Sequence, residues 1–368
     1  MDRNERIHEL DSLRGLAAIG VIAWHYTNHF HASPFPALMA PFYRHGLLLV
    51  DFFFVLSGFV LARTYWNERR AGDLVANIRD RIARLYPLHF ATLCLVAAMQ
   101  WLLVHSFREP AFVYTFNDKY DFFLNLFLLN RTGLERGWSF NAPSWSISTE
   151  FIVNTAFLFC ISTRRRASEV LLAVFLTISA IVILRNGLIS NARTIGIDND
   201  IFRATLGFGV GVILFRISGS LERIRAAKPI CDAIALTSIS CFLYYCAKSP
   251  LSNTSDLAMM LICFPLLIVS ATRGALVKKL LRLPPLVFLG TISYSIYLVH
   301  FPLQLAMHTI GVASGRELPY ASRALFAVFM AVTVFVSWIT YRSIELPGKN
   351  VMRKLLGRRR TAPTAQPN

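Results

Sequence analysis

Residues 47–66, LLLVDFFFVLSGFVLARTYW, form a stretch in which only Asp51 and Arg63 carry a charge. An apolar run of about 20 residues is long enough to cross the ~30 Å hydrocarbon core of a bilayer as an α-helix. Similar runs recur before and after this one, so the chain is predicted to cross a membrane ten times. The predicted spans are residues 10–28, 47–66, 86–105, 145–161, 168–186, 200–217, 230–247, 254–272, 286–310 and 321–342.

The composition of the 368-residue chain excludes a soluble enzyme, a disordered chain and a fibrous protein. Hydrophobic residues make up 55% and charged residues only 16%, against roughly 25% charged residues in soluble domains. The 38 Lys and Arg exceed the 21 Asp and Glu, but they are scattered between the apolar runs, which argues against nucleic acid as a partner. The six cysteines lie within apolar runs and are interpreted as small hydrophobic residues, without a disulfide or a metal site. The expected fold class is an all-α integral membrane protein.

The distribution of basic residues predicts the orientation of the helices. If the N-terminus is cytoplasmic, 26 of the 38 Lys and Arg fall on the cytoplasmic side and 8 fall outside. Cytoplasmic loops carry such an excess of positive charge, so both chain ends are predicted to be cytoplasmic. Residues 1–357 are expected to form the membrane domain and residues 358–368 a basic, disordered tail. The longest outer loop, 106–144, is polar enough to line an entrance.

Ionisable residues inside the predicted spans indicate a candidate site, because a charge is costly within a bilayer. Arg14 and His25 are eleven residues apart in the first span, which is about three helical turns, so both project from one face. A snorkelling arginine and an interfacial histidine would explain this spacing equally well. At one level near the outer surface, the predicted topology places four titratable residues from four helices: His25, Asp51, Glu150 and His300.

The grouping of histidine with carboxylates favours general-base catalysis. Imidazole titrates near neutrality, and a neighbouring carboxylate orients the ring and stabilises its protonated form. Ser146 and Glu150 share one face of the fourth span at a spacing of four residues. The ninth span carries a polar stripe of Ser293, Tyr297, His300 and Gln304. Hydrogen bonds between helices would explain this stripe as well as a substrate-lining surface does.

A second group of ionisable residues falls toward the predicted cytoplasmic side. It contains Arg14, Glu345 and the pair Arg81 and Arg84, which are three residues apart. Two guanidinium groups at this spacing form a fork suited to phosphates. The alternative interpretation is that the pair only adds to the positive charge of the cytoplasmic side.

Five stretches of the chain resemble the acyltransferase-3 family of integral membrane O-acyltransferases. RGLAAIGVIAWH (14–25) matches the arginine-x10-histidine motif of that family, and VDFFFVLSGFV (50–60) is similar to its second-helix signature. The other three stretches are RIARLYPLH (81–89), PSWSISTEF (143–151) and LGTISYSIYLVHFP (289–302). Each match alone is weak, but five in the family's order are highly specific.

The resemblance implies a ten-helix enzyme of the bacterial cytoplasmic membrane that acylates hydroxyl groups of carbohydrates or lipids. The acyl group is expected to be acetyl, supplied as acetyl-CoA from the cytoplasm, with no permanently bound cofactor. By this resemblance Arg14 and His25 form the essential pair, Arg81 and Arg84 bind the donor, and Glu150 is the glutamate of the Trp-Ser motif. The chain stops eleven residues after Gly357, so it is expected to be the stand-alone type, which acetylates O-antigens, exopolysaccharides or nodulation factors.

The expected mechanism places the donor's phosphates at the arginines and its thioester near His25. His25, assisted by Glu150 or Asp51, would remove the proton of the acceptor hydroxyl; Ser146, Tyr297 and His300 would line the substrate. A covalent acyl-histidine intermediate is the alternative route. Succinyl or a longer acyl group is an alternative donor, and a secondary transporter is the alternative class. No internal inverted repeat of the kind found in many transporters is seen in the sequence.

Overall fold

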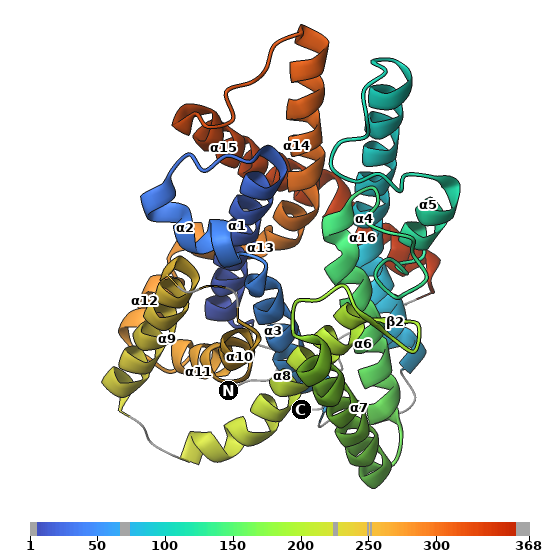
Figure 1. Ribbon diagram of the computed structural model, residues 1–368. Coiled ribbons are helices and arrows are strands. Elements are labelled where there is room, and N and C mark those ends of the chain that lie inside the picture. The colour runs from blue at the N-terminus through green and yellow to red at the C-terminus, as the bar shows by residue number, and fades with distance from the viewer. Residues whose placement is uncertain (1–5, 67–73, 224–226, 249, 251, 358–368) are drawn as a thin grey trace, which may run out of the picture.

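The computed structural model describes residues 6–66, 74–223, 227–248, 250 and 252–357 (Figure 1). In these ranges the chain is mostly helical, with one short two-stranded hairpin. Nine of the described helices are long and apolar enough to cross a membrane. The predicted all-α membrane class is therefore confirmed, whereas the cytoplasmic location of both chain ends stays a prediction. The predicted tail, residues 358–368, lies outside the described residues.

The first half of the chain supplies the central helices, and α1 differs from the other long ones in not being among the nine apolar spans. α1 is 23 residues long, but Glu9, Asp11, Arg14 and three histidines lower its hydropathy, so it corresponds to the predicted first span without being one of the nine apolar helices. The elements up to the hairpin are α1 (His8–Phe30), α2 (Pro36–His45), α3 (Leu48–Tyr65), α4 (Leu74–His105), α5 (Lys119–Leu126), η2 (Ala142–Ser144), α6 (Trp145–Ser162), α7 (Arg165–Asn186), β1 (Arg193–Thr194) and β2 (Ile197–Asp198).

The second half packs around these helices, with α9, α11 and α12 on one side of the molecule (Figure 1). Two of its helices contain a π-helical turn, η3 and η4, and so run on as single long spans. The elements are α8 (Asn199–Arg223), α9 (Lys228–Lys248), α10 (Asn253–Ala258), η3 (Met259–Cys263), α11 (Phe264–Ala271), α12 (Leu276–Leu281), α13 (Pro284–Thr291), α14 (Ser293–Ser314), α15 (Arg323–Thr340), η4 (Tyr341–Glu345) and α16 (Leu346–Leu355).

Two predicted boundaries are wrong in ways that affect the site. The span predicted at 286–310 is two helices, α13 and α14, because the backbone of Ile292 (φ −98°, ψ 7°) leaves the helical conformation. The span predicted to begin at residue 86 begins at Leu74 instead, so Arg81 and Arg84 lie on the same helix as the apolar segment. The helix geometry therefore holds both arginines at a fixed place relative to the core.

The position of α1 is fixed by a backbone-to-backbone contact with α13. A Cβ atom added to Gly15 would lie 2.6 Å from the amide nitrogen of Gly290, so glycine is needed for the two helices to approach this closely. α3 lies beside α1 in the middle of the molecule and buries Phe52, Phe54 and Leu56 in the main core (Figure 1). These contacts hold the two helices that carry Arg14, His25 and Asp51.

Candidate active site

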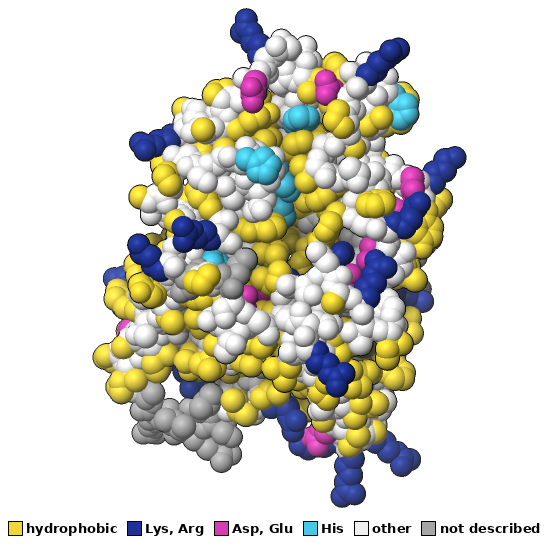
Figure 2. Space-filling view, viewed as in Figure 1, with side chains coloured by type: hydrophobic (Ala, Val, Ile, Leu, Met, Phe, Trp, Pro, Cys, Tyr) yellow, Lys and Arg dark blue, Asp and Glu magenta, His cyan; other side chains and the backbone are white. Residues whose placement is uncertain are grey.

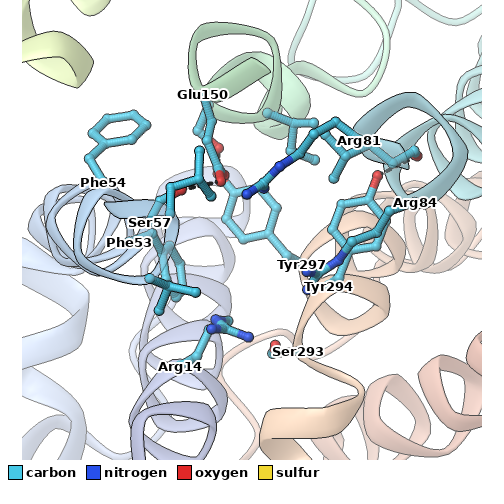
Figure 3. Close-up of a pocket in the computed structure, with 15 residues that line it drawn as sticks. Arg14, Phe53, Phe54, Ser57, Arg81, Arg84, Glu150, Ser293, Tyr294 and Tyr297 are labelled. Carbon is cyan, nitrogen blue, oxygen red and sulfur yellow. Dashed lines mark hydrogen bonds between the residues drawn. The ribbon is translucent and has the colours of Figure 1, made fainter. Parts of the chain in front are cut away.

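Three arginines from two helices converge on one cavity, which we call the cationic cavity. Arg14 reaches it from α1, and Arg81 and Arg84 reach it from α4. Figure 3 shows the three side chains around one opening, together with Glu150 of α6. The cavity has a volume of about 130 Å³, and its other polar lining residues are Ser57, Ser146, Ser293, Tyr294 and Tyr297. The predicted donor-binding residues are thus brought together.

Glu150 belongs to this cavity and accepts a hydrogen bond at 2.6 Å from the hydroxyl group of Ser57 on α3. The side-chain amide of Asn154, one turn along α6, donates a longer bond of 3.4 Å to the same carboxylate oxygen. Arg81 and Arg84 have no hydrogen bond or salt bridge to any residue that the structure describes. The cavity therefore presents unpaired guanidinium groups, the arrangement that binds phosphate oxygens.

A second, larger cavity adjoins the first, and we call it the vestibule. It has a volume of about 430 Å³ and shares Arg14, Arg84, Ser293 and Tyr294 with the cationic cavity. Five basic side chains line it against two acidic ones. These residues are Arg6, Arg14, Arg63, Arg84 and Lys349, with Asp11 and Glu345.

His25 lines a third cavity, the histidine cavity, with a volume of about 330 Å³. Figure 2 shows a hollow in the face of the molecule with histidine side chains along its edge. The loop 106–144 contributes part of the wall, including Val113, Tyr114 and Arg131. The lining is rich in aromatic rings and amides: Trp24, Tyr114, Trp138, Trp145, Asn28 and Asn191.

The hydrogen bonding of His25 assigns the roles of its two ring nitrogens. Nδ1 lies 3.0 Å from the carbonyl oxygen of Val21, which can only accept, so Nδ1 carries the proton. In the neutral ring Nε2 holds the lone pair, and it forms no hydrogen bond to a described residue. The ring packs against His300 at a centroid distance of 4.8 Å and against His29 at 5.3 Å. In its neutral form, His25 thus has a free nitrogen that can accept a proton.

The structure does not bring Glu150 or Asp51, the two expected carboxylate partners, into the cavity that His25 lines. Glu150 lies in the cationic cavity, and Asp51 is held by Arg203 of α8, whose Nε and Nη2 donate to the two carboxylate oxygens at 2.8 and 2.6 Å. Both members of this ion pair are about 1% exposed or less. The physical reason is that a buried arginine needs a carboxylate more than a neutral imidazole does. The predicted depth of Asp51 did not reveal its partner.

His300 is fully buried, and both of its ring nitrogens lack a hydrogen-bond partner among the described residues. Next to it, His29 contacts the side-chain oxygen of Gln304 at 2.6 Å and the hydroxyl of Tyr114 at 3.0 Å. Groups of three His, Cys, Asp or Glu side chains able to hold a metal ion are absent from the described part of the chain. The histidines therefore form a cluster with spare hydrogen-bonding capacity.

Tyr297 and Ser146 stand between the cationic cavity and the histidine cavity. The Ser146 hydroxyl donates to the Tyr297 hydroxyl at 2.8 Å, and the Tyr297 ring lies 5.8 Å from that of His300 and 6.0 Å from that of Phe53. Ser146 and its neighbour Trp145 face different cavities. These two predicted lining residues form a wall that separates the arginines from His25.

Part of the lining of the histidine cavity is held by ion pairs that the sequence reasoning missed. Arg131 donates to Asp200 at 2.8 Å, contacts Asp198 at 3.1 Å and lies over the ring of Trp138 at 4.3 Å. Burial raises the pKa of Asp198 to about 6. Arg203 could have been found from sequence, since an arginine inside a predicted span requires a partner. Ser57 and Lys349 gave no such signal.

Comparison with known proteins identifies the family to which this site belongs. The acyltransferase-3 family model, described as an acyltransferase domain, matches residues 7–342. The chain belongs to the acyltransferase-3 family. It is an enzyme, an O-acyltransferase, and its apolar helices make it an integral membrane protein.

Three relatives illustrate the range of the similarity. Acyltransferase MdmB of Streptomyces mycarofaciens is 28% identical over 389 residues, covering 98% of this chain and 95% of MdmB. Protein 2 in the picA locus of Rhizobium radiobacter is 28% identical over 194 residues, covering 49% of this chain and 94% of that protein. Peptidoglycan O-acetyltransferase OatA of Listeria monocytogenes is 24% identical, covering 93% of this chain but only 55% of OatA. No solved structure matches the chain.

Proposed function

We propose that this enzyme transfers an acetyl group from cytoplasmic acetyl-CoA to a hydroxyl group of a bacterial polysaccharide, lipid-linked sugar or related glycoconjugate at the cytoplasmic membrane. The observation that carries the proposal is the pairing of a cationic cavity with a histidine cavity across one wall. The names of the OatA relatives, which are O-acetyltransferases, support acetyl as the transferred group.

The charge of the cationic cavity supports a phosphate-bearing donor. Arg14, Arg81 and Arg84 outnumber the one carboxylate there, Glu150, and planar guanidinium groups bind phosphate oxygens in pairs. A CoA thioester joins phosphates at one end to an uncharged acyl group at the other. With its phosphates at the arginines, its acyl end points along α1 toward His25, past the wall of Tyr297 and Ser146.

The lining of the histidine cavity supports a sugar-like acceptor. Trp24, Trp138 and Trp145 supply flat apolar faces, while Asn28 and Asn191 supply amide groups. Ligand sites combine apolar surface with a few oriented polar groups in this way, and a sugar ring presents both apolar C–H faces and hydroxyl groups. Such a ring would bring a hydroxyl group near the free Nε2 of His25.

In the proposed reaction, Nε2 of His25 removes the proton of the acceptor hydroxyl as its oxygen attacks the thioester carbonyl carbon. The new C–O bond forms and the C–S bond breaks. The proton then passes from His25 to the departing sulfur of CoA, so the histidine returns to its neutral state. His300, predicted to line the substrate, is fully buried and does not line the histidine cavity; it packs against the ring of His25 instead.

The proposal is tested by measuring O-acetyl groups on the surface polysaccharides and glycolipids of cells that contain or lack the protein. Loss of an O-acetyl group in its absence, restored by the wild-type chain, is the expected result. Cells that lack the protein and are given the Arg14→Gln variant should regain the O-acetyl group only weakly. The reason is that this change leaves the donor's phosphates without one guanidinium group. Unchanged acylation in cells lacking the protein would contradict the proposed acceptor class.

A further inference from the structure

The vestibule holds more positive charge than its own residues neutralise. Of its two acidic side chains, Asp11 is bound by Arg6 at 2.5 Å and by Arg14 at 3.0 Å. Glu345 accepts a hydrogen bond at 2.7 Å from Ser295. The carboxylates are therefore already engaged, and an excess of cationic side chains faces the cavity.

Lys349 is held in the vestibule wall by the packing of α16 against α4. A Cβ atom added to its neighbour Gly348 would lie 2.5 Å from Cβ of Pro87, so a larger residue would push α16 away from α4. One turn further along, Arg353 forms a 3.2 Å salt bridge with Asp80 of α4. These two contacts fix the helix on either side of Lys349, and the lysine is partly buried as a result.

Neither Lys349 nor Arg84 forms a hydrogen bond or a salt bridge with a residue that the structure describes. Both nevertheless line the same cavity. Lys349 is partly buried and Arg84 is exposed, and two like charges that face one cavity repel each other unless an anion binds between them. The neighbouring basic residues Arg6 and Arg14 do have partners, both with Asp11.

We propose that Lys349 binds the 3′-phosphate of the acyl-CoA donor, an inference that rests on the proposed function. Coenzyme A carries two separate anionic groups, the diphosphate that leads to the pantetheine arm and the phosphate on the ribose. The forked arginines of the cationic cavity suit the diphosphate, whereas the ammonium group of a lysine suits a single terminal phosphate. Because the vestibule and the cationic cavity share Arg84 and Arg14, one donor molecule can occupy both.

The inference predicts that the enzyme distinguishes acetyl-CoA from acetyl-dephospho-CoA, which differ only in the 3′-phosphate. Binding is measured with the purified full-length protein in nanodiscs of phosphatidylcholine, by calorimetry, for wild type, Lys349→Gln and Lys354→Gln. Lys354 is the matched control, since it lies on the same helix but is exposed and does not line the vestibule.

We expect wild type to bind acetyl-CoA about tenfold or more tightly than acetyl-dephospho-CoA, as one charged hydrogen bond allows. Lys349→Gln should weaken the binding of acetyl-CoA to the level of acetyl-dephospho-CoA. The affinity for acetyl-dephospho-CoA should stay unchanged. Lys354→Gln should behave like wild type. Adding anionic phosphatidylglycerol to the nanodiscs should not change the difference in affinity between acetyl-CoA and acetyl-dephospho-CoA. The reason is that the proposed site binds a nucleotide phosphate and not a lipid headgroup.

Three outcomes would overturn the inference. Equal binding of the two donors by wild type would mean that the 3′-phosphate is not contacted, whether or not any variant folds. An equal loss for both donors in Lys349→Gln would reduce Lys349 to a general source of positive charge. Loss of the difference in phosphatidylglycerol would assign the site to a lipid headgroup. Binding of neither donor by wild type would instead remove the proposed donor itself.

Discussion

Replacement of His25 by alanine separates donor binding from chemistry. His25 lies in the histidine cavity, whereas the donor's phosphates are proposed to bind in the cationic cavity, and the two cavities share no lining residue. His25→Ala should therefore leave the dissociation constant of acetyl-CoA within about twofold of wild type while transfer is lost. General-base catalysis contributes about 10²- to 10⁴-fold, so residual transfer should fall below about 1%.

The structure also predicts that His25→Ala folds. The hydrogen bond from Nδ1 goes to the Val21 carbonyl, which as residue i−4 in the same helix is already the acceptor of the His25 backbone N–H. Removing the ring leaves no buried carbonyl unpaired, so the loss should be near that of one ordinary hydrogen bond, about 1 kcal/mol. Thermal unfolding in the same nanodiscs measures this.

The assay uses radiolabelled acetyl-CoA with membranes and the cell-envelope fraction as acceptor, and thiol release is followed in parallel. His31→Ala is the control, because His31 is exposed just after α1 and lines none of the three cavities. His25→Gln should be as inactive as His25→Ala, since glutamine cannot take up the proton. Transfer above half of the wild-type rate in His25→Ala would refute His25 as the base and make His300 the next candidate.

Three further predictions concern the arginines, the buried ion pair and the topology. Arg84→Lys keeps the charge but loses the planar fork, so the KM for acetyl-CoA should rise several-fold while the protein folds normally; an unchanged KM would contradict phosphate binding. Arg203→Ala should lower stability by about 3–5 kcal/mol, because Asp51 is left buried without its partner; the double change with Asp51→Leu should recover part of this in thermal unfolding. A reporter fused after Lys119 should lie outside and one fused after Lys279 in the cytoplasm, and finding both on one side would contradict the orientation.

Helix positions were predictable from sequence because the requirement for about 20 apolar residues is local. The nine apolar helices correspond to nine of the predicted spans. The break at Ile292 was not predictable, since the apolar run of residues 286–310 continues through it. Nor was the early start of α4, whose first turns carry polar residues and are stabilised by packing against α16.

The individual residues of the candidate site were predictable from the sequence, but which of them share a cavity was not. The predicted depth of each residue along its helix placed Arg14, Arg81 and Arg84 together, and the structure has them in one cavity. Depth carries no information about which face of a helix meets which neighbour, so Glu150 was placed beside His25 when it faces the arginines. Pairing of Asp51 required knowledge of α8, because only the three-dimensional packing shows which carboxylate a buried arginine reaches.

The contact between Gly15 and Gly290 fixes the position of α1 and therefore the places of Arg14 and His25. With the backbone of α1 pressed directly against α13, the helix cannot slide or turn to suit a different ligand. Arg14 and His25 are then spaced by helix geometry alone, eleven residues at 1.5 Å or about 16 Å along the axis. In the proposed reaction this fixed interval is matched to the constant length of the pantetheine arm, which is the same whatever acyl group it carries. Discrimination among acyl groups would then depend on the side chains that line the histidine cavity near His25. These can vary without changing the distance between Arg14 and His25.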